Sequence, residues 1–214
     1  MNKGLLILLI YVSSCAPSRF IEPLNKGEQA VFFNVGGSLI EYADMTIPVP
    51  LTSLTYGNGL TEKLTVFGSL HTTSLIFNNF QTEVGIVSHV RNQERWIPAL
   101  SSSLALNFIT ELSKGNAKLW PQIDGNAYWN LNANKHRLHL GYSIWIDTQM
   151  LDENRIGIIN PHFGYTYKMK TYELGTELKL LAPGTDNSKV FLPYQSIMGD
   201  RGATGIYLTL TKRF

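Results

Sequence analysis

Apolar and hydroxyl-bearing residues alternate in the last ten residues of the chain, GIYLTLTKRF. Ile206, Leu208 and Leu210 occupy every second position, and a tyrosine or threonine follows each of them. Successive side chains of a β-strand point to opposite faces, so this segment has one apolar and one polar face. After residue 28, no apolar run approaches the roughly 20 residues that a membrane-spanning helix needs. The pattern therefore predicts strands, and it restricts any membrane crossing to a closed β-barrel.

The same period of two recurs in nine further segments, two of which are weaker. The clear segments are 29–40, 62–70, 100–110, 119–130, 137–147, 159–169 and 172–180, and the weaker ones are 51–56 and 80–88. Together with the C-terminal segment they give ten strands. The sequence predicts an all-β fold, a closed antiparallel transmembrane β-barrel over residues 28–214 with about ten strands, eight and twelve being the alternatives.

A soluble β-sandwich would show the same alternation, because only the placement of the apolar face differs. Two further features favour the membrane barrel. Several segments reach the 9 to 11 residues, roughly, of an outer-membrane strand, which exceeds the usual length of soluble strands. Five strands also place an aromatic residue on the apolar face near the same end, as expected at a membrane interface. These residues are Tyr56, Trp129, Tyr167, Tyr172 and Phe214.

The connections alternate between short and long, which predicts the orientation of the barrel. Short turns such as YGNGLTEK, NLNANKHR and KMKTY lie at the same end as both termini, and longer ones such as TQMLDENRIG lie at the other. Short turns are typical of the periplasmic side of outer-membrane barrels. We therefore expect the N- and C-termini of the barrel to be periplasmic.

The last strand resembles the C-terminal recognition signal of bacterial outer-membrane β-barrels, with Leu208 and Leu210 outward and Phe214 at the carboxyl end. The stretch YGNGLTEKLTVFGSL also resembles the hairpin turn of such barrels. Lys212 departs from the signal, which usually carries an aromatic or apolar residue there, but a lysine can snorkel at the interface. The resemblance covers essentially residues 28–214. It implies contact with outer-membrane lipids and recognition by the barrel-assembly machinery during biogenesis.

The first fifteen residues, MNKGLLILLIYVSSC, have the layout of a secretory signal: a positive start, an apolar stretch and small residues before a cysteine. Residues 12–15 resemble a bacterial lipobox, and Cys15 is the only cysteine in the chain. We therefore expect a lipoprotein signal peptide over 1–14 and a lipidated tether over 15–27. The tether lacks the acidic run of some surface lipoproteins, which by that resemblance implies an anchor on the periplasmic side. An ordinary signal peptide with an unmodified cysteine is the alternative.

Charged residues on the polar face predict what fills the lumen. They are Lys63, Glu83, Lys118, Asp124, Arg137, Lys168, Glu173, Glu177, Lys179 and Arg213. Both signs occur, and buried charges need partners, so we expect a network of internal ion pairs. A small polar pore is the alternative, but it needs a wider bore than about ten strands usually leave.

An enzyme site would rest on His71, Asp124, Asp147 and His162, which the predicted register directs inward near the extracellular end. Outer-membrane proteases of similar size hold paired acids and a histidine there, which makes these weak candidates. Ser102 points outward without a histidine on its face, which disfavours a lipid-hydrolysing dyad. His136 and His139 fall on opposite strand faces, so they predict no metal site.

Composition argues against one further class of function, nucleic-acid binding. Only 16% of residues are charged and the net charge is +2, without basic runs, so no nucleic-acid partner is predicted. No cofactor is predicted either. The sequence thus indicates a small outer-membrane β-barrel lipoprotein, not an enzyme, with a structural or accessory role in an envelope complex. A narrow solute pore, and a hydrolase with its site at the extracellular barrel mouth, are the alternatives.

Overall fold

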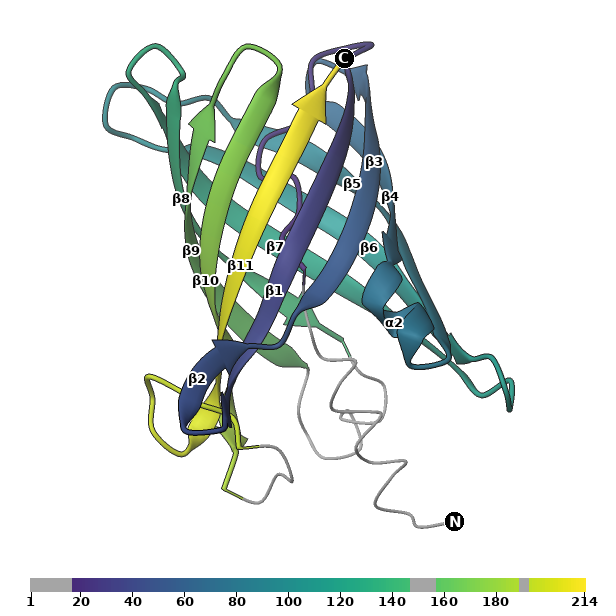
Figure 1. Ribbon diagram of the computed structural model, residues 1–214. Coiled ribbons are helices and arrows are strands. Elements are labelled where there is room, and N and C mark those ends of the chain that lie inside the picture. The colour runs from purple at the N-terminus through teal and green to yellow at the C-terminus, as the bar shows by residue number, and fades with distance from the viewer. Residues whose placement is uncertain (1–16, 147–156, 189–192) are drawn as a thin grey trace.

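The computed structural model describes residues 17–146, 157–188 and 193–214, and it is a closed antiparallel β-barrel (Figure 1). Eleven strands are present, and all except β2 form the barrel wall, which gives ten wall strands. The wall strands are β1 (Gln29–Tyr42), β3 (Leu51–Thr61), β4 (Leu64–His71), β5 (Asn79–Arg91), β6 (Ala99–Glu111), β7 (Ala117–Leu131), β8 (His136–Trp145), β9 (Ile158–Lys168), β10 (Tyr172–Asp186) and β11 (Arg201–Arg213). The predicted fold class and strand number are confirmed.

The barrel closes where the first and last strands pair. β1 and β11 are antiparallel from Ala30 opposite Arg213 to Ser38 opposite Gly205. This pairing satisfies the backbone groups that an open sheet edge would expose, which is the condition for crossing a bilayer with strands. The short strand β2 (Met45–Pro48) pairs only with β1, and α2 (Thr72–Ile76) links β4 to β5. No helix among the described residues is long and apolar enough to cross a membrane.

Figure 1 shows both ends of the barrel. The C-terminus, the start of β1 and the short connections 62–63, 132–135 and 169–171 lie at one end, which we call the C-terminal mouth. β2 and α2 lie at the opposite end, which we call the α2 mouth.

The wall is apolar outside and polar inside, the reverse of a soluble protein. Leu208 is 56% exposed and Val84 is 58% exposed, whereas Asn34 and Gln122 are 2% and 1% exposed. Such a continuous apolar surface requires a nonpolar solvent, and the hydrocarbon core of a bilayer supplies it. The alternation that the sequence predicts is therefore present, with the apolar face outward.

The aromatic residues that the sequence assigns to the outer face lie there. Tyr56, Tyr167, Tyr172 and Phe214 are all at least 40% exposed. Trp129 is half-buried because its indole nitrogen donates a hydrogen bond to the backbone oxygen of Trp96, 2.8 Å away. These side chains can therefore reach the membrane interface.

Residues 17–24 lie inside the barrel although they belong to no helix or strand. We call them the plug segment; Figure 1 shows this part of the chain within the barrel wall. Every residue of the plug segment is buried except Glu22, which is half-buried. An exposed turn at 25–28 joins it to β1, with Gly27 at φ 78° and its nitrogen 2.8 Å from the Gly59 oxygen. These residues belong to the stretch 15–27 that the sequence predicts as a lipidated tether, and their position in the lumen was not predicted.

Candidate functional site: the plugged lumen

Arg19 of the plug segment lies at the centre of a buried polar cluster. Its Nε donates to Glu83 Oε1 at 3.1 Å, and its Nη2 also donates to Glu83 Oε2, so the contact is bidentate. Nη2 further donates to Gln122 Oε1 at 3.0 Å, and Nη1 is 3.9 Å from Asp124 Oδ2. One guanidinium thereby pairs with Glu83 on β5 and lies within ion-pair distance of Asp124 on β7. Planar bidentate pairing of this kind is the strong form of a charged hydrogen bond.

The wall supplies the remaining hydrogen bonds of the two acids. Ser69 donates to Glu83 Oε1 at 2.9 Å. Ser103 donates to Asp124 Oδ2 at 2.5 Å, and Gln122 donates to Asp124 Oδ1 at 2.7 Å. A buried ion pair is tolerable when such bonds satisfy its other lone pairs. Arg19 therefore occupies a position that the wall is already built to receive.

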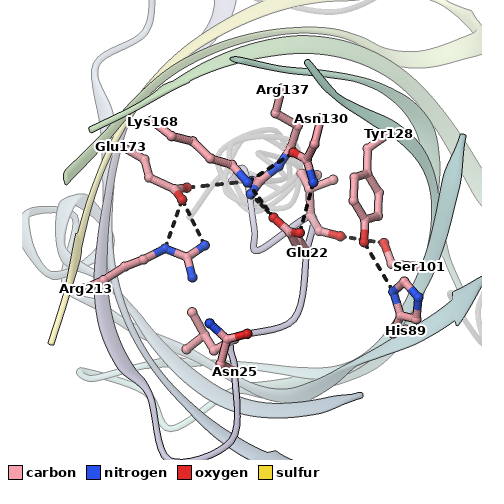
Figure 2. A network of polar contacts seen from close by, with 12 residues as sticks. Glu22, Asn25, His89, Ser101, Tyr128, Asn130, Arg137, Lys168, Glu173 and Arg213 are labelled. Carbon is pink, nitrogen blue, oxygen red and sulfur yellow. Dashed lines mark hydrogen bonds and ion pairs between the residues drawn. The ribbon is translucent and has the colours of Figure 1, made fainter. Parts of the chain in front are cut away.

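Glu22 anchors the plug segment at the C-terminal mouth with the opposite charge (Figure 2). Its carboxylate accepts from Arg137, from Lys168 at 2.6 Å and from Asn130 at 3.0 Å. Beside it, Arg213 donates to Glu173 at 2.9 Å and to Glu28 at 3.0 Å. The plug segment thus carries one cation and one anion, and each faces wall residues of the opposite sign.

Apolar contacts hold the plug segment between these charged positions. Phe20 and Leu24 belong to a buried cluster with Phe32, Phe67, Val87, Ala30 and Ala105. The ring centroids of Phe20 and Phe32 are 5.5 Å apart. Gly57 makes this packing fit, because a Cβ there would lie 2.7 Å from the Phe20 ring. Both the charge pattern and the shape of the wall therefore match residues 17–24.

Little open volume remains in the lumen around the plug segment. Two voids of about 20 and 10 Å³ lie beside it. A cavity must offer at least about 10 to 15 Å³ to hold one water molecule, so these voids admit only isolated waters. A larger cavity of about 510 Å³ opens at the C-terminal mouth, beside Glu22, Lys168 and Arg213. Beside the plug segment, the described residues therefore leave room only for isolated waters.

The predicted charges form ion pairs around the plug segment, with one clear exception. Glu83, Arg137, Lys168, Glu173, Glu177, Lys179 and Arg213 all have ion-pair partners inside the barrel. Lys118 is half-buried at the start of β7. Lys63 instead is exposed in the connection 62–63, because β3 ends at Thr61 and β4 begins at Leu64. The prediction of Lys63 as a lumen residue is therefore wrong.

The three weak catalytic candidates that the structure describes do not pair with one another. Asp124 pairs with Arg19, and His162 Nε2 is 2.8 Å from Asn126 Oδ1. His71 is buried at the end of β4, and Asp147 lies outside the described residues. Within residues 17–146, 157–188 and 193–214, no hydrogen bond or ion pair links His71, Asp124 and His162 to one another. His136 bonds Tyr165 on the outer face while His139 is buried, so these two histidines do lie on opposite faces.

The residues that sequence reasoning missed are those of the plug segment. In SRFIEPL, apolar residues are interleaved with Arg19 and Glu22, which is unusual for a solvated tether. This mixture of apolar and charged residues was the signal that could have identified a buried segment. Nothing in it identifies the partners, because Glu83 lies 64 positions and Gln122 lies 103 positions further along the chain.

No family model and no curated protein matches this chain. Among solved structures, the KdgM porin is 10% identical with a TM-score of 0.45, covering 87% of this chain and 99% of that chain. An outer membrane channel from Pseudomonas putida F1 is 8% identical with a TM-score of 0.44, covering 93% and 100%. The Ail protein of Yersinia pestis is 10% identical with a TM-score of 0.30, covering 88% and 99%.

These identities and TM-scores are low, so the similarity is one of architecture and carries no functional argument. The barrel itself defines the class. A closed wall of ten strands, apolar outside and polar inside, makes this chain a transmembrane β-barrel of the outer-membrane type.

Proposed function

We propose that this protein is a closed outer-membrane barrel with a structural or accessory role in an envelope complex. The observation that supports this role is the plug segment, which fills the lumen with matched charges and apolar packing. A barrel filled in this way supplies a rigid membrane-embedded body and no path for solutes. In the proposed orientation the C-terminal mouth faces the periplasm, and Leu208, Leu210 and Phe214 present the assembly signal during biogenesis.

A gated narrow pore is the second candidate, and one observation favours it. The plug segment forms no strand with the wall, so side-chain contacts and a few backbone groups hold it in place. Such a segment can leave without breaking the barrel ladder. The proposal of a closed barrel requires that it stays in place without a trigger.

Conductance in planar bilayers distinguishes the two. The unmodified protein is expected to show no steady current, because the voids beside the plug segment hold only isolated waters. Deletion of residues 17–24 is expected to produce an ohmic conductance, because the vacated space fills with water. Stable, ion-selective openings of the unmodified protein would favour the pore and contradict the closed barrel. A deletion variant that folds but conducts no current would show that the plug segment is not what closes the lumen.

The proposal includes a lipid anchor at Cys15 on the periplasmic side, a residue that lies outside the described ones. Metabolic labelling with a lipid analogue should tag the wild type and not Cys15→Ala; equal labelling of both would contradict lipidation. Pro17 is buried in the lumen, where its oxygen accepts from Lys179 at 3.1 Å. Two residues span at most about 7 Å, so a labelled wild type would mean that Pro17 leaves this contact in the lipidated form, while the plug residues from Arg19 onward stay in place.

No enzymatic role is part of the proposal. No hydrogen bond or ion pair among the described residues links His71, Asp124 and His162, and Asp124 pairs with Arg19. A general base must lie within hydrogen-bond reach of the group that it activates.

A further inference from the structure

Three potential metal ligands converge on the inner face of three consecutive strands. His139 lies on β8, His162 on β9 and Glu177 on β10, and all three are buried. One ring nitrogen of each histidine and one carboxylate oxygen lie within 4.8 Å of one another. We propose that these residues form a binding site for a divalent transition-metal ion, with Zn²⁺ as the best match. Two imidazoles and one carboxylate are a ligand set that zinc prefers, leaving a fourth position for water.

The strand register places these side chains together. His139 is opposite Gly164 on β9, and Gly164 is opposite Glu177 on β10, so His139 and Glu177 flank a glycine in one row of the wall. A Cβ at position 164 would lie 2.3 Å from His139 Cε1 and 2.6 Å from its Nε2. The imidazole therefore occupies the space that the missing side chain leaves.

The second histidine has the same arrangement one row away. His162 is opposite Gly141 on β8, and a Cβ at position 141 would lie 2.7 Å from His162 Nε2. The two ring centroids are 6.0 Å apart. Two inner-face glycines thus create room for two imidazoles that lie over the wall and beside each other.

The hydrogen bonds of the cluster are incomplete in the protein alone. His139 Nε2 is 2.9 Å from Glu177 Oε2, and His162 Nε2 is 2.8 Å from Asn126 Oδ1. The Nδ1 atoms of both rings are buried and have no hydrogen-bond partner in the described structure. Buried polar atoms without partners cost free energy. Coordination of a metal through Nδ1 would satisfy these atoms, whereas coordination through Nε2 would replace the contacts to Glu177 and Asn126.

The two carboxylate oxygens of Glu177 have different partners, and this arrangement suits a metal-binding residue. Oε2 faces His139, whereas Oε1 accepts from Ser18 at 2.9 Å and pairs with Lys179 at 2.9 Å. Oε2 has His139 as its partner and could exchange that contact for a metal, while Oε1 is held in place by outer-shell partners, as is common for metal-binding carboxylates. Lys179 also donates to the Pro17 oxygen and lies 5.3 Å from the Tyr207 ring centroid, so it has other contacts when a cation binds nearby.

This inference requires only the barrel fold and does not depend on the structural role proposed above. Because Ser18 contacts Glu177, the ion would bind directly beneath the plug segment. Metal binding and plug position are therefore expected to influence each other.

The test titrates Zn²⁺ into the purified, folded full barrel after treatment with a chelator, using calorimetry. We expect saturable binding of one equivalent. His139→Ala and His162→Ala should each weaken it by more than the roughly 10- to 100-fold that the loss of an outer-shell partner costs. His71→Ala is the matched control, because His71 is another buried lumen histidine but lies outside the cluster. Heat-modifiable gel migration checks that each variant is folded.

Zinc K-edge X-ray absorption of the unmodified protein supplies a readout that needs no variant. We expect a nitrogen and oxygen shell with the scattering of two imidazoles. The inference is overturned if the wild type shows no saturable one-equivalent binding, if both histidine variants bind as the wild type does, or if the spectrum lacks imidazole ligands.

Discussion

Arginine at position 208 is expected to lower the free energy of unfolding by about 2 to 4 kcal/mol, the cost of a cation on the lipid face near the bilayer midplane. Leu208 is 56% exposed on the outer surface, so the new charge would face acyl chains. Arginine at the next position should cost less. Thr209 points inward and lines the 20 Å³ void with Glu173 and Glu177, so the new charge would lie beside carboxylates and away from lipid. A remaining cost there would come from steric crowding.

Heat-modifiable migration and denaturant unfolding of the refolded proteins measure this difference. Leu208→Arg should unfold at a lower denaturant concentration than Thr209→Arg, and Leu208→Ala controls for the lost side-chain volume. The opposite order, with Leu208→Arg as stable as the wild type and Thr209→Arg unable to fold, would show that the two faces are inverted. The protein would then be a soluble β-domain.

The strands of the barrel wall could be predicted from the sequence because the alternation of apolar and polar residues is a local pattern. A period of two assigns each residue to a face from its neighbours alone, and it places Leu208 outward and Tyr207 inward as the structure does. The errors fall where a strand ends. Lys63 continues the alternation of 62–70, but the turn between β3 and β4 takes that position, and the side chain becomes exposed.

The contents of the lumen could not be predicted because they depend on contacts far apart in the sequence. The plug segment has no periodicity of its own. The burial of Phe20 and Leu24 depends on Phe32 and Phe67, which pack around them in the folded barrel. The histidine cluster was missed for the same reason. Sequence spacing compares His136 with His139, whereas the cluster needs the register that sets His139 and Glu177 on either side of Gly164. Register between strands is fixed by turns and packing that no single strand reveals.

We propose that the N-terminal plug segment closes this outer-membrane barrel from within, and the accessibility of an introduced cysteine tests this proposal. Ser18 is 3% exposed and donates to Glu177, whereas Lys63 is exposed in its turn. Each is replaced by cysteine in a Cys15→Ala background and treated, folded, with a large hydrophilic maleimide. Ser18→Cys should react at least about a hundredfold more slowly than Lys63→Cys, corresponding to about 3 kcal/mol of local opening, and both should react alike in denaturant. Equal rates in the folded barrel would contradict the claim.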